Sequence, residues 1–399
     1  MTDVSFSKPQ ESVAASGLRV LHIINGLGVG GAENMLLKLA SAPSSLGVAH
    51  EVVSLDNGGP LLTRYREAGV TVHCLALYKT NPRPRHLQAL GARIREFDPT
   101  VIHGWMYYGN LAALIGRWWS KSRASVAWNI RQTIYDLNRE KVMTALAIRA
   151  GARLSRRTDG IVYNSVTSAL QHENLGYESS KRILLPNGFD CTRFAPDAAT
   201  RHRIRQQLGL GRDDLVVALV ARYHPMKDHK GFVAAAALLA RESAKIKFLI
   251  VGHEVTSLHD SLLSAGIRDR TVLQEVQKDT SLMYKAADIA CSSSAWGEGF
   301  SNAIGEAMAC GLPCVVTDVG DSALIVGGTG RVVPRRNPEA LAAAMASLLT
   351  DDFVALGRAA RRRIETEYSL EAVVARYESF YRSLSSRRAK VITDSTSLP

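Results

Sequence analysis

The chain has 399 residues, of which 46% are hydrophobic, and a formal net charge of +12 at pH 7. This length predicts two domains, and the hydrophobic content is enough for sizeable cores, which excludes a chain too polar to fold. All apolar runs are shorter than the ~18–20 residues that cross a bilayer, and the first residues lack a signal peptide, so we expect a cytoplasmic protein.

The five cysteines are scattered, and none lies in a Cys/His cluster with zinc-ligand spacing, so we expect reduced thiols and no metal site. The positive charge is concentrated between residues 117 and 157, which contain ten Lys or Arg and two acidic residues. Nucleic acid and anionic lipid both suit such a stretch. Because no nucleic-acid-binding module accompanies it, an anionic membrane surface is the favoured partner.

The N-terminal region opens with a polar stretch and then a glycine-rich loop. Residues 1–17 show no pattern, and we expect them to be disordered. A buried strand at 19–24 runs into the loop 26–31 (GLGVGG), which satisfies Gly-x-Gly-x-x-Gly, and Asp56 ends the next strand. These features match the dinucleotide-binding fingerprint. An NAD-dependent oxidoreductase that uses this loop is therefore one alternative.

Two further strands end in polar side chains. The strand at 100–103 ends in His103, and the strand at 126–131 ends in Arg131. Side chains at the carboxyl ends of parallel strands point into the crevice where such sheets bind ligands. His103 is therefore a candidate site residue, with a hydrogen-bonded core histidine as the alternative.

A pair of cations follows the first strand of the second half. The strand at 215–221 leads to Arg222 and Lys227, which precede an alanine-rich helix. Arginine offers a planar fork and lysine a point charge, and both suit a diphosphate. Solvated loop charges are the alternative interpretation.

The stretch 291–320 (CSSSAWGEGFSNAIGEAMACGLPCVVTDVG) predicts a strand, a glycine turn, a helix and a second strand. Ser301 is the expected N-cap of the helix and Gly311 its expected C′ glycine. The helix N-terminus offers unpaired N–H groups and partial positive charge to a phosphate.

Two carboxylates bracket this helix start. Glu298 lies in the turn, where it could hold sugar hydroxyls near the phosphate. Glu306 lies about two turns further on, where it could reach the hydroxyls of a ribose. Gly299 would let ligand atoms approach the backbone closely. A solvated pair on a surface helix is the alternative.

The segment EGFSNAIGEAMACGLPCVVTDVG resembles the donor-site signature of retaining glycosyltransferases of the GT-B fold, family 4, and the resemblance extends over about 18–385. It implies an α/β protein whose two Rossmann-like parallel-sheet domains face a central cleft. The segment 186–190 resembles the family's interdomain linker. The resulting division is an acceptor-binding domain at 18–188, a donor-binding domain at 189–367, a helix at about 368–385 that crosses back, and a tail at 386–399.

The resemblance also implies roles for single residues. Glu298 would contact the transferred sugar, and Glu306 would contact the ribose. Arg222 and Lys227 would bind the pyrophosphate, and His103 would lie beside the donor sugar. The catalytic candidates are therefore His103, Glu298, Arg222 and Lys227. The donor-binding candidates are Gly28, Gly30, Gly31, Gly299, Phe300, Ser301, Asn302, Ala303 and Glu306. The acceptor-side candidates are Asn25, Arg131 and Asn187.

We therefore expect a retaining hexosyl or N-acetylhexosaminyl transferase that uses a UDP- or GDP-linked sugar and needs no cofactor or metal. The expected acceptor is a polyprenyl-diphosphate-linked or other saccharide in exopolysaccharide or lipopolysaccharide synthesis. Trp118 and Trp119 beside basic residues predict a peripheral position at the inner face of the cytoplasmic membrane. A glycosyltransferase with a soluble acceptor and a non-catalytic binding module are further alternatives.

Overall fold

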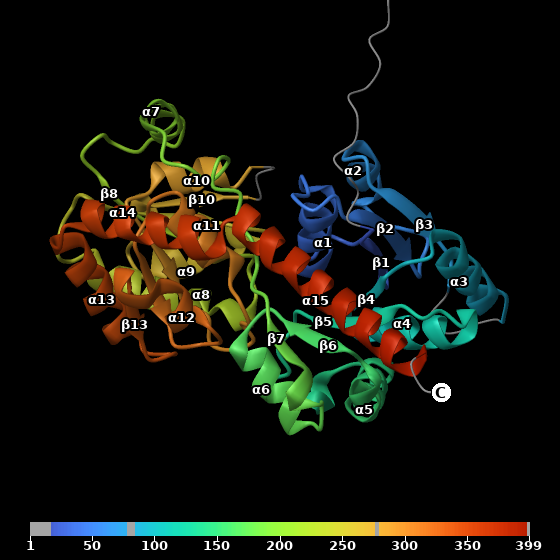
Figure 1. Cartoon of the computed structure of the whole chain (residues 1–399). Coiled ribbons are helices and arrows are strands. Elements are labelled where there is room, and N and C mark those ends of the chain that lie inside the picture. Colours follow the sequence, from blue (N-terminus) through green and yellow to red (C-terminus); the bar gives the residue numbers. More distant parts are fainter. Residues whose placement is uncertain (1–16, 78–83, 276–278, 397–399) are drawn as a thin grey trace, which may run out of the picture. The chain divides into compact units, whose positions relative to one another are not determined.

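The computed structural model describes residues 17–77, 84–275 and 279–396 (Figure 1). The chain divides into two compact units, Met1–Asn129 with Leu154–Ile161 and Val374–Pro399, and Ile130–Arg153 with Val162–Val373. This division differs from the expected boundary at residue 188, because 130–153 and 162–188 group with the second unit. The functional boundary at residue 188 therefore stays a prediction.

The first sheet has seven strands in the order β3-β2-β1-β4-β5-β6-β7. Its strands are β1 Arg19–Ile24, β2 Ala49–Ser54, β3 Thr71–Cys74, β4 Val101–Trp105, β5 Ser125–Ile130, β6 Gly160–Tyr163 and β7 Arg182–Leu184. The pairs β1–β2, β2–β3, β1–β4 and β4–β5 all run parallel. The helices in this half of the sequence are α1 Gly31–Ser41, α2 Leu62–Glu67, α3 Pro84–Phe97, α4 Met106–Ser120, α5 Val142–Leu154 and α6 Val166–Asn174, with short 3-10 turns at Leu137–Arg139, Ser155–Arg157 and Ser179–Lys181.

Strands β4 and β5 are buried along their whole length, as central strands of a parallel sheet covered on both faces should be. Two glycines let α4 pack directly on the sheet. A Cβ on Gly109 would collide with the carbonyl oxygen of Ile23 in β1, and a Cβ on Gly104 would lie 2.5 Å from the Cα of Asn110. The close approach of helix and strands therefore depends on the absence of side chains at both positions.

The second sheet has six strands in the order β10-β9-β8-β11-β12-β13. Its strands are β8 Leu215–Val220, β9 Ile246–Val251, β10 Thr271–Gln274, β11 Ile289–Ser292, β12 Cys314–Thr317 and β13 Arg331–Val333, all paired in parallel. Its helices are α7 Ala198–Gln207, α8 His229–Leu239, α9 His259–Ser264, α10 Ser281–Ala286, α11 Asn302–Ala309, α12 Ser322–Val326, α13 Pro338–Thr350 and α14 Phe353–Arg363. Short turns lie at η4 Pro225–Lys227, Val255–Leu258, Arg268–Arg270 and Gly327–Thr329, and a π-helical turn lies at Ile364–Tyr368.

Alternation along β8 builds a core on each face of this sheet. Val216 and Ala218 belong to a cluster that includes the apolar side of α11, whereas Val217 and Leu219 belong to a cluster that includes Phe232 of α8. This is the period of two that a strand covered on both faces requires. Helices therefore cover both faces, and the polar loops lie at the strand ends.

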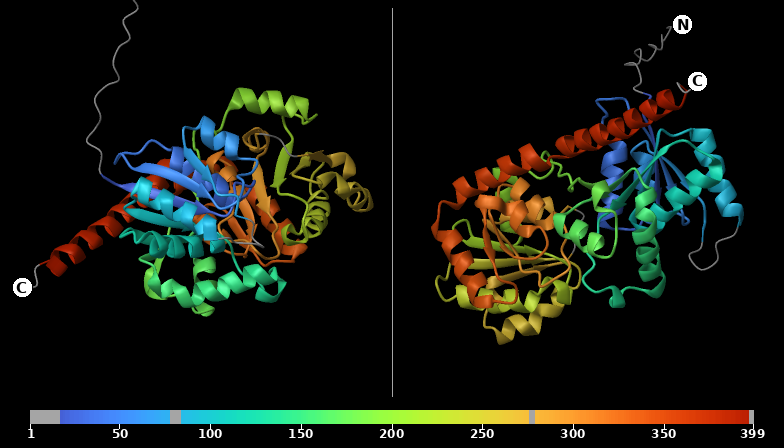
Figure 2. Two further views of the ribbon diagram at one scale, coloured as in Figure 1. Left: turned by 90° about the vertical axis from the view of Figure 1, so that its right-hand side faces the viewer. Right: turned by 60° about the horizontal axis from the view of Figure 1, so that its bottom comes forward.

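The long last helix, α15 (Leu370–Thr396), contributes to the first unit from Val374 onward (Figure 2). The hydroxyl of Tyr377 accepts a hydrogen bond of 3.0 Å from the side-chain amide of Asn129, and both residues are buried. The carboxylate of Glu378 accepts hydrogen bonds from the hydroxyls of Ser44 (2.5 Å) and Ser45 (2.7 Å). The amphipathic helix expected near residues 368–385 is therefore present, and its apolar side faces the core of this unit.

His103 was expected at the end of its strand, and that expectation is wrong. Strand β4 continues to Trp105, so His103 lies in its middle. The imidazole has no exposed surface, and its Nδ1 lies 2.8 Å from the hydroxyl of Tyr381 in α15. This placement favours the alternative interpretation, a hydrogen-bonded core histidine.

No single helix in residues 17–77, 84–275 and 279–396 is both long and apolar enough to cross a membrane. The pair Pro338–Thr350 and Phe353–Tyr368 reaches that length and composition only when the two are joined across a bend of 101°.

Candidate active site

The candidate site lies where the order of the second sheet reverses direction. Strands β8 and β11 are neighbours, although β9 and β10 separate them in sequence. In open α/β sheets, ligands bind at the carboxyl ends of the two strands that flank such a switch point. The loop 221–228 follows β8 and the loop 293–301 follows β11, so the predicted cations and the predicted glutamate turn meet at one edge of the sheet.

The two loops are joined by main-chain and side-chain hydrogen bonds. The amide of Ala295 donates to the carbonyl of Met226 at 2.8 Å, and the hydroxyl of Ser293 donates to the carbonyl of Lys227 at 2.7 Å. The first loop is itself fixed by His224, whose Nδ1 accepts from the amide of Met226 at 3.1 Å. These hydrogen bonds therefore hold the two loops together and fix the positions from which their side chains extend.

Lys227 and Glu298 form an ion pair across these loops. The Lys227 ammonium donates to Oε1 of Glu298, and the hydroxyl of Ser294 donates to the same oxygen at 2.6 Å. The Glu298 side chain is 9% exposed and the Lys227 side chain 19% exposed. A charge pair and a hydrogen bond of this kind offset the cost of burying a carboxylate so deeply.

The turn that carries Glu298 depends on glycines. Gly297 has φ +78°, and a Cβ there would collide with the sulfur of Met226. Gly320, with φ +63°, lies directly against the carbonyl of Glu298, and a side chain there would collide with it. The amide of Asp321 donates to the carbonyl of Gly299 at 3.0 Å and so supports the turn from behind.

Helix α11 begins immediately after this turn, as the sequence predicted. Ser301 occupies the N-cap position with an extended backbone, but its hydroxyl makes no capping hydrogen bond. At the other end Gly311 follows the cap with φ +78°, in agreement with its predicted C′ role. The eight-residue helix therefore begins, without a side-chain cap, beside the Lys227–Glu298 pair, which is a suitable arrangement for a phosphate.

Arg222 lies in the loop after β8, and Glu306 lies in the body of α11. Arg222 is exposed and forms no ion pair or side-chain hydrogen bond with the part of the chain that the structure describes. Glu306 is half-buried within α11, near the buried Tyr284, whose hydroxyl donates to the carbonyl of Ala303 at 3.1 Å. Burial, and then the neighbouring Glu306 carboxylate, raise the pKa of Tyr284 well above its usual range.

Two residues predicted for the acceptor side are linked to the start of α11, Asn187 directly and Arg131 through Asn187. Arg131 donates to the side-chain oxygen of Asn187, and Asn187 donates to the side-chain oxygen of Asn302 at 2.6 Å and to the carbonyl of Phe300 at 3.3 Å. All four residues lie in the second unit. Arg131 and Asn187 therefore fix the start of α11, and any role in acceptor binding stays a prediction.

The glycine loop and Asn25 lie in the first unit. The carbonyl of Asn25 accepts from the amide of Asp56 at 2.8 Å, and Gly30 is the N-cap of α1, which begins at Gly31. Gly28 lies in the loop just before this cap. The loop therefore joins β1 to α1 as the sequence predicted, and its part in donor binding stays a prediction.

Ser294 and Asp321 contribute to the site but were not predicted from the sequence. Asp321 is 5% exposed, and its carboxylate accepts from the amides of Val166 (2.7 Å) and Thr167 (3.0 Å) at the start of α6. The signal for Ser294 was its place in the polar run directly after β11. The signal for Asp321 was the turn glycine that precedes it. Neither signal indicates which group the side chain contacts.

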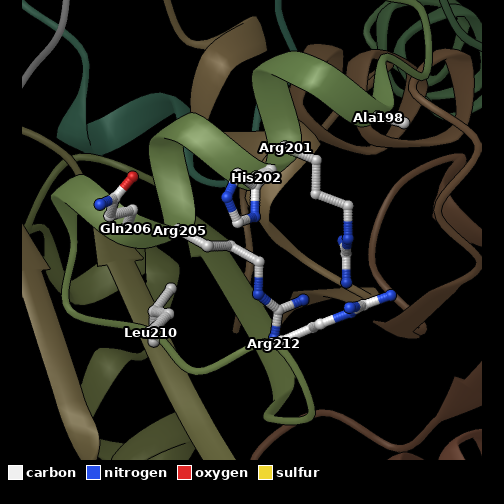
Figure 3. Close-up of a pocket in the computed structure, with 7 residues that line it drawn as sticks. All are labelled: Ala198, Arg201, His202, Arg205, Gln206, Leu210 and Arg212. Carbon is white, nitrogen blue, oxygen red and sulfur yellow. The ribbon is translucent and has the colours of Figure 1, made fainter.

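A separate hollow of about 610 Å³ lies beside α7 (Figure 3). In it the guanidinium groups of Arg201, Arg205 and Arg212 lie near one another. Asp288 neutralises part of this charge, at 2.6 Å from Arg201 and 3.6 Å from Arg205. Because Asp288 directly precedes β11, this hollow lies at the opposite edge of the sheet from Glu298. We therefore assign Arg201 and Arg205 a structural role in holding α7 on the sheet.

Among the described residues, no group of three or more His, Cys, Asp or Glu side chains is arranged to hold a metal ion. Arg222 and Lys227, the cations predicted to bind a diphosphate, both lie in the loop after β8, and that role stays a prediction.

Comparisons with known proteins agree with this geometry. A family model described as "Glycosyl transferases group 1" matches residues 200–368, and one described as "Glycosyl transferase 4-like domain" matches residues 30–188. Together they account for both halves of the chain. The oxidoreductase alternative has no support from these matches.

Curated relatives include the D-inositol 3-phosphate glycosyltransferases of Mycobacteroides abscessus and Kineococcus radiotolerans. The first is 32% identical over 214 residues, 51% of this chain and 47% of that protein, and the second is 31% identical over 215 residues, 48% and 49%. The chain thus aligns with about half the length of these relatives.

Solved structures support the GT-B fold. Anabaena Alr3699/HepE in complex with UDP has a TM-score of 0.81 at 18% identity, covering 92% of this chain and all of that one. A glycosyltransferase from Rickettsia africae has a TM-score of 0.78 at 16% identity, covering 92% and 98%. The two parallel-sheet α/β domains therefore have the GT-B fold, as the sequence predicted.

Proposed function

We propose that this chain, a glycosyltransferase of the GT-B type, binds a nucleotide sugar in its second unit and transfers the sugar to an acceptor hydroxyl. The observation that carries the proposal is the Lys227–Glu298 ion pair beside the uncapped start of α11. A cation, a carboxylate and helix amides at a switch point are what the phosphates and the hydroxyls of such a donor require.

The ion pair suggests how the donor is received. Lys227 neutralises the buried Glu298 through their ion pair. When the diphosphate binds, we infer that Lys227 turns to its oxygens, and Glu298 then accepts hydrogen bonds from hydroxyls of the sugar. Arg222, which is exposed and makes no ion pair among the described residues, adds a second cation. Glu306, one to two turns further along α11, would hold the ribose.

Catalysis would be mainly electrostatic. The bond between C1 and the diphosphate oxygen breaks as the acceptor oxygen forms its bond to C1, and the acceptor proton passes to the departing phosphate. Lys227, Arg222 and the α11 amides stabilise the negative charge that develops on the leaving group. We propose that this occurs without a metal ion and, through attack on the face that the diphosphate leaves, with retention of configuration.

We propose a uridine nucleotide as the first donor to test and a guanosine nucleotide as the second. Relatives in fold were solved with UDP and with UDP-glucose, which makes UDP-linked hexoses and N-acetylhexosamines the natural starting set. A glycosyltransferase "involved in lipopolysaccharide biosynthesis" also shares the fold, with a TM-score of 0.66 at 16% identity.

For the acceptor we propose a polyprenyl-diphosphate-linked saccharide of cell-surface polysaccharide synthesis, at the inner face of the cytoplasmic membrane. The basic stretch 117–157 and the 75% exposed Trp118 support this position, whereas Trp119 packs against α3 near Gly91. A soluble phosphorylated acceptor is the second candidate, because the curated relatives are named D-inositol 3-phosphate glycosyltransferases.

The proposal is tested by incubating the full chain with a panel of nucleotide sugars and measuring release of the nucleoside diphosphate. The expected result is slow release with one nucleotide class in the absence of an acceptor, and faster release when the matching acceptor is added. Lys227→Ala should abolish most of the release, while Lys230→Ala, a neighbouring exposed lysine on α8, should not. Binding of no nucleotide by the wild-type chain would overturn the proposal.

A further inference from the structure

Helix α5 exposes a patch of aliphatic side chains on its outward face. Its inward face packs Ala145, Ile148 and Ala152 into the core, each less than 10% exposed. On the opposite face Val142 is 75% exposed, and the patch continues with Met143 (56%) and Leu146 (50%). Single exposed aliphatic residues are ordinary, but three within the first one and a half turns of one helix form a patch that suits an apolar partner.

Cations follow this patch at helical spacing. Arg149 and Arg153 lie on the same outward face as Leu146 and are exposed, and Lys141 precedes the helix. Within the described part of the chain, none of the three forms an ion pair or a side-chain hydrogen bond. Acidic residues near the helix start are already engaged.

The engaged acids are Glu140 and Asp136. Glu140 accepts a hydrogen bond of 2.9 Å from the side-chain amide of Gln132, and Asp136 lies 3.6 Å from Arg139. The outward face of α5 therefore combines an uncovered apolar end with a cationic end whose charges have no partner in this unit. A partner surface that matches this face would have an apolar layer to contact the apolar end and a negatively charged layer to contact the cationic end.

We propose that α5 lies in the surface of an anionic lipid bilayer. Val142, Met143 and Leu146 would enter the boundary between headgroups and acyl chains, and Lys141, Arg149 and Arg153 would contact the lipid phosphates. This is how amphipathic helices with one apolar and one cationic region bind membranes in the plane of the interface. The proposal does not rest on the transfer reaction, but it would bring the enzyme to a lipid-linked acceptor.

The experiment is sedimentation of the full chain with vesicles of phosphatidylglycerol and phosphatidylcholine, and with vesicles of phosphatidylcholine alone. We expect binding to the anionic vesicles that weakens as salt rises, and little binding to the neutral ones. Leu146→Glu should reduce the partition coefficient at least tenfold. Leu263→Glu, which places the same charge at a 55% exposed leucine on α9, should leave it unchanged.

The cationic part is tested separately. Arg149→Gln combined with Arg153→Gln should weaken binding about 25-fold, on the scale of ~1 kcal/mol, or about fivefold, for each basic residue near an anionic surface. Arg241→Gln combined with Lys245→Gln removes the same charge from an exposed turn elsewhere in the second unit and should have a much smaller effect.

The proposal is overturned if the wild-type chain ignores anionic vesicles at low salt, or if the α5 variants and their controls bind alike. It is also overturned if Leu146→Glu instead dissociates a dimer seen by light scattering, which would assign the patch to a second copy. Release of nucleoside diphosphate is measured in parallel. If the α5 variants lose vesicle binding but still release nucleoside diphosphate, the result concerns the membrane proposal alone. If the wild type releases no nucleoside diphosphate, the result concerns the proposed reaction and not the membrane proposal.

Discussion

Lys227 and Glu298 are 71 positions apart in the sequence but form an ion pair at the carboxyl ends of the neighbouring strands β8 and β11. Ser294 adds a second hydrogen bond of 2.6 Å to the same carboxylate oxygen. Glu298 places a buried negative charge at the proposed diphosphate site, although a diphosphate would need positive charge there. The two charges therefore balance each other, and under the proposed function a donor would take Lys227 away from Glu298.

Glu298→Gln should separate turnover from binding. The change removes the charge that would contact the sugar, so turnover should fall by at least ~10², the scale for a lost transition-state interaction. Because Lys227 loses its partner, affinity for the free nucleoside diphosphate should stay the same or rise. Rates of diphosphate release and calorimetric titration check this. Loss of affinity as large as the loss of turnover would contradict the assignment.

Lys227→Ala should lower turnover by at least ~10², and activity should survive chelation. The same variant leaves the buried Glu298 without its cation, so the melting temperature should also fall. Release assays with and without EDTA, together with thermal unfolding, check both effects. Complete inhibition by EDTA that magnesium or manganese restores would show that a metal, and not Lys227 with Arg222, balances the diphosphate.

Buried histidines should make the protein less stable in mild acid. Burial lowers the pKa of His172 from 6.5 to about 4, and its Nδ1 lies 2.8 Å from the carbonyl of Ser168. Between pH 6.5 and 4 the unfolded chain binds a proton that the folded chain does not, so stability falls as pH falls. At pH 5 this one group should cost about 2 kcal/mol.

The same direction holds for His50, whose pKa burial lowers to about 4. Urea unfolding at pH 7 and pH 5 measures the total loss. His172→Gln cannot take up the proton and should lose about 2 kcal/mol less than the wild type over this interval, whatever its stability at pH 7. An equal pH dependence in both proteins would show that His172 does not contribute.

Asp288→Asn should destabilise the second unit. Asp288 lies between Arg201 and Arg205, and the Arg205 side chain is only 5% exposed, so the variant leaves a buried guanidinium without its counter-charge. The expected loss is about 3–5 kcal/mol in the free energy of unfolding. Asp213→Asn, at an exposed position in the loop before β8, is the matched control. Equal midpoints in urea for the two variants would contradict a structural role for this cluster.

The sequence could predict the elements of the donor site but not its contacts. Local signals, namely the glycine turn, the N-cap serine and the C′ glycine, were sufficient to place α11 between Ser301 and Gly311. The pairing of Glu298 with Lys227 depends on the order of the sheet, which no local pattern encodes. Each residue could be assigned to the site, but the ion pair between them could not.

His103 and Asn187 illustrate the same limit. A histidine in a buried strand looks the same in sequence whether it faces a ligand or a partner, and here the partner is Tyr381, 278 positions away. Asn187 was predicted on the acceptor side, and no local pattern indicated that it also donates to the side chain of Asn302. The exposure of the aliphatic side chains of α5 could not be predicted from the sequence either, because an apolar residue in a helix is more often buried than exposed.

The most direct test of a donor site at α11 is calorimetric titration of UDP and GDP into the wild type, Glu306→Gln and a control, Glu242→Gln, which changes an exposed glutamate that follows α8. We expect that one nucleotide binds the wild type and that Glu306→Gln weakens this binding by about 1–3 kcal/mol, the value of a hydrogen bond to a charged group. Glu242→Gln should bind as the wild type does. Unchanged affinity in Glu306→Gln, or binding of neither nucleotide to the wild type, would contradict a donor site at α11.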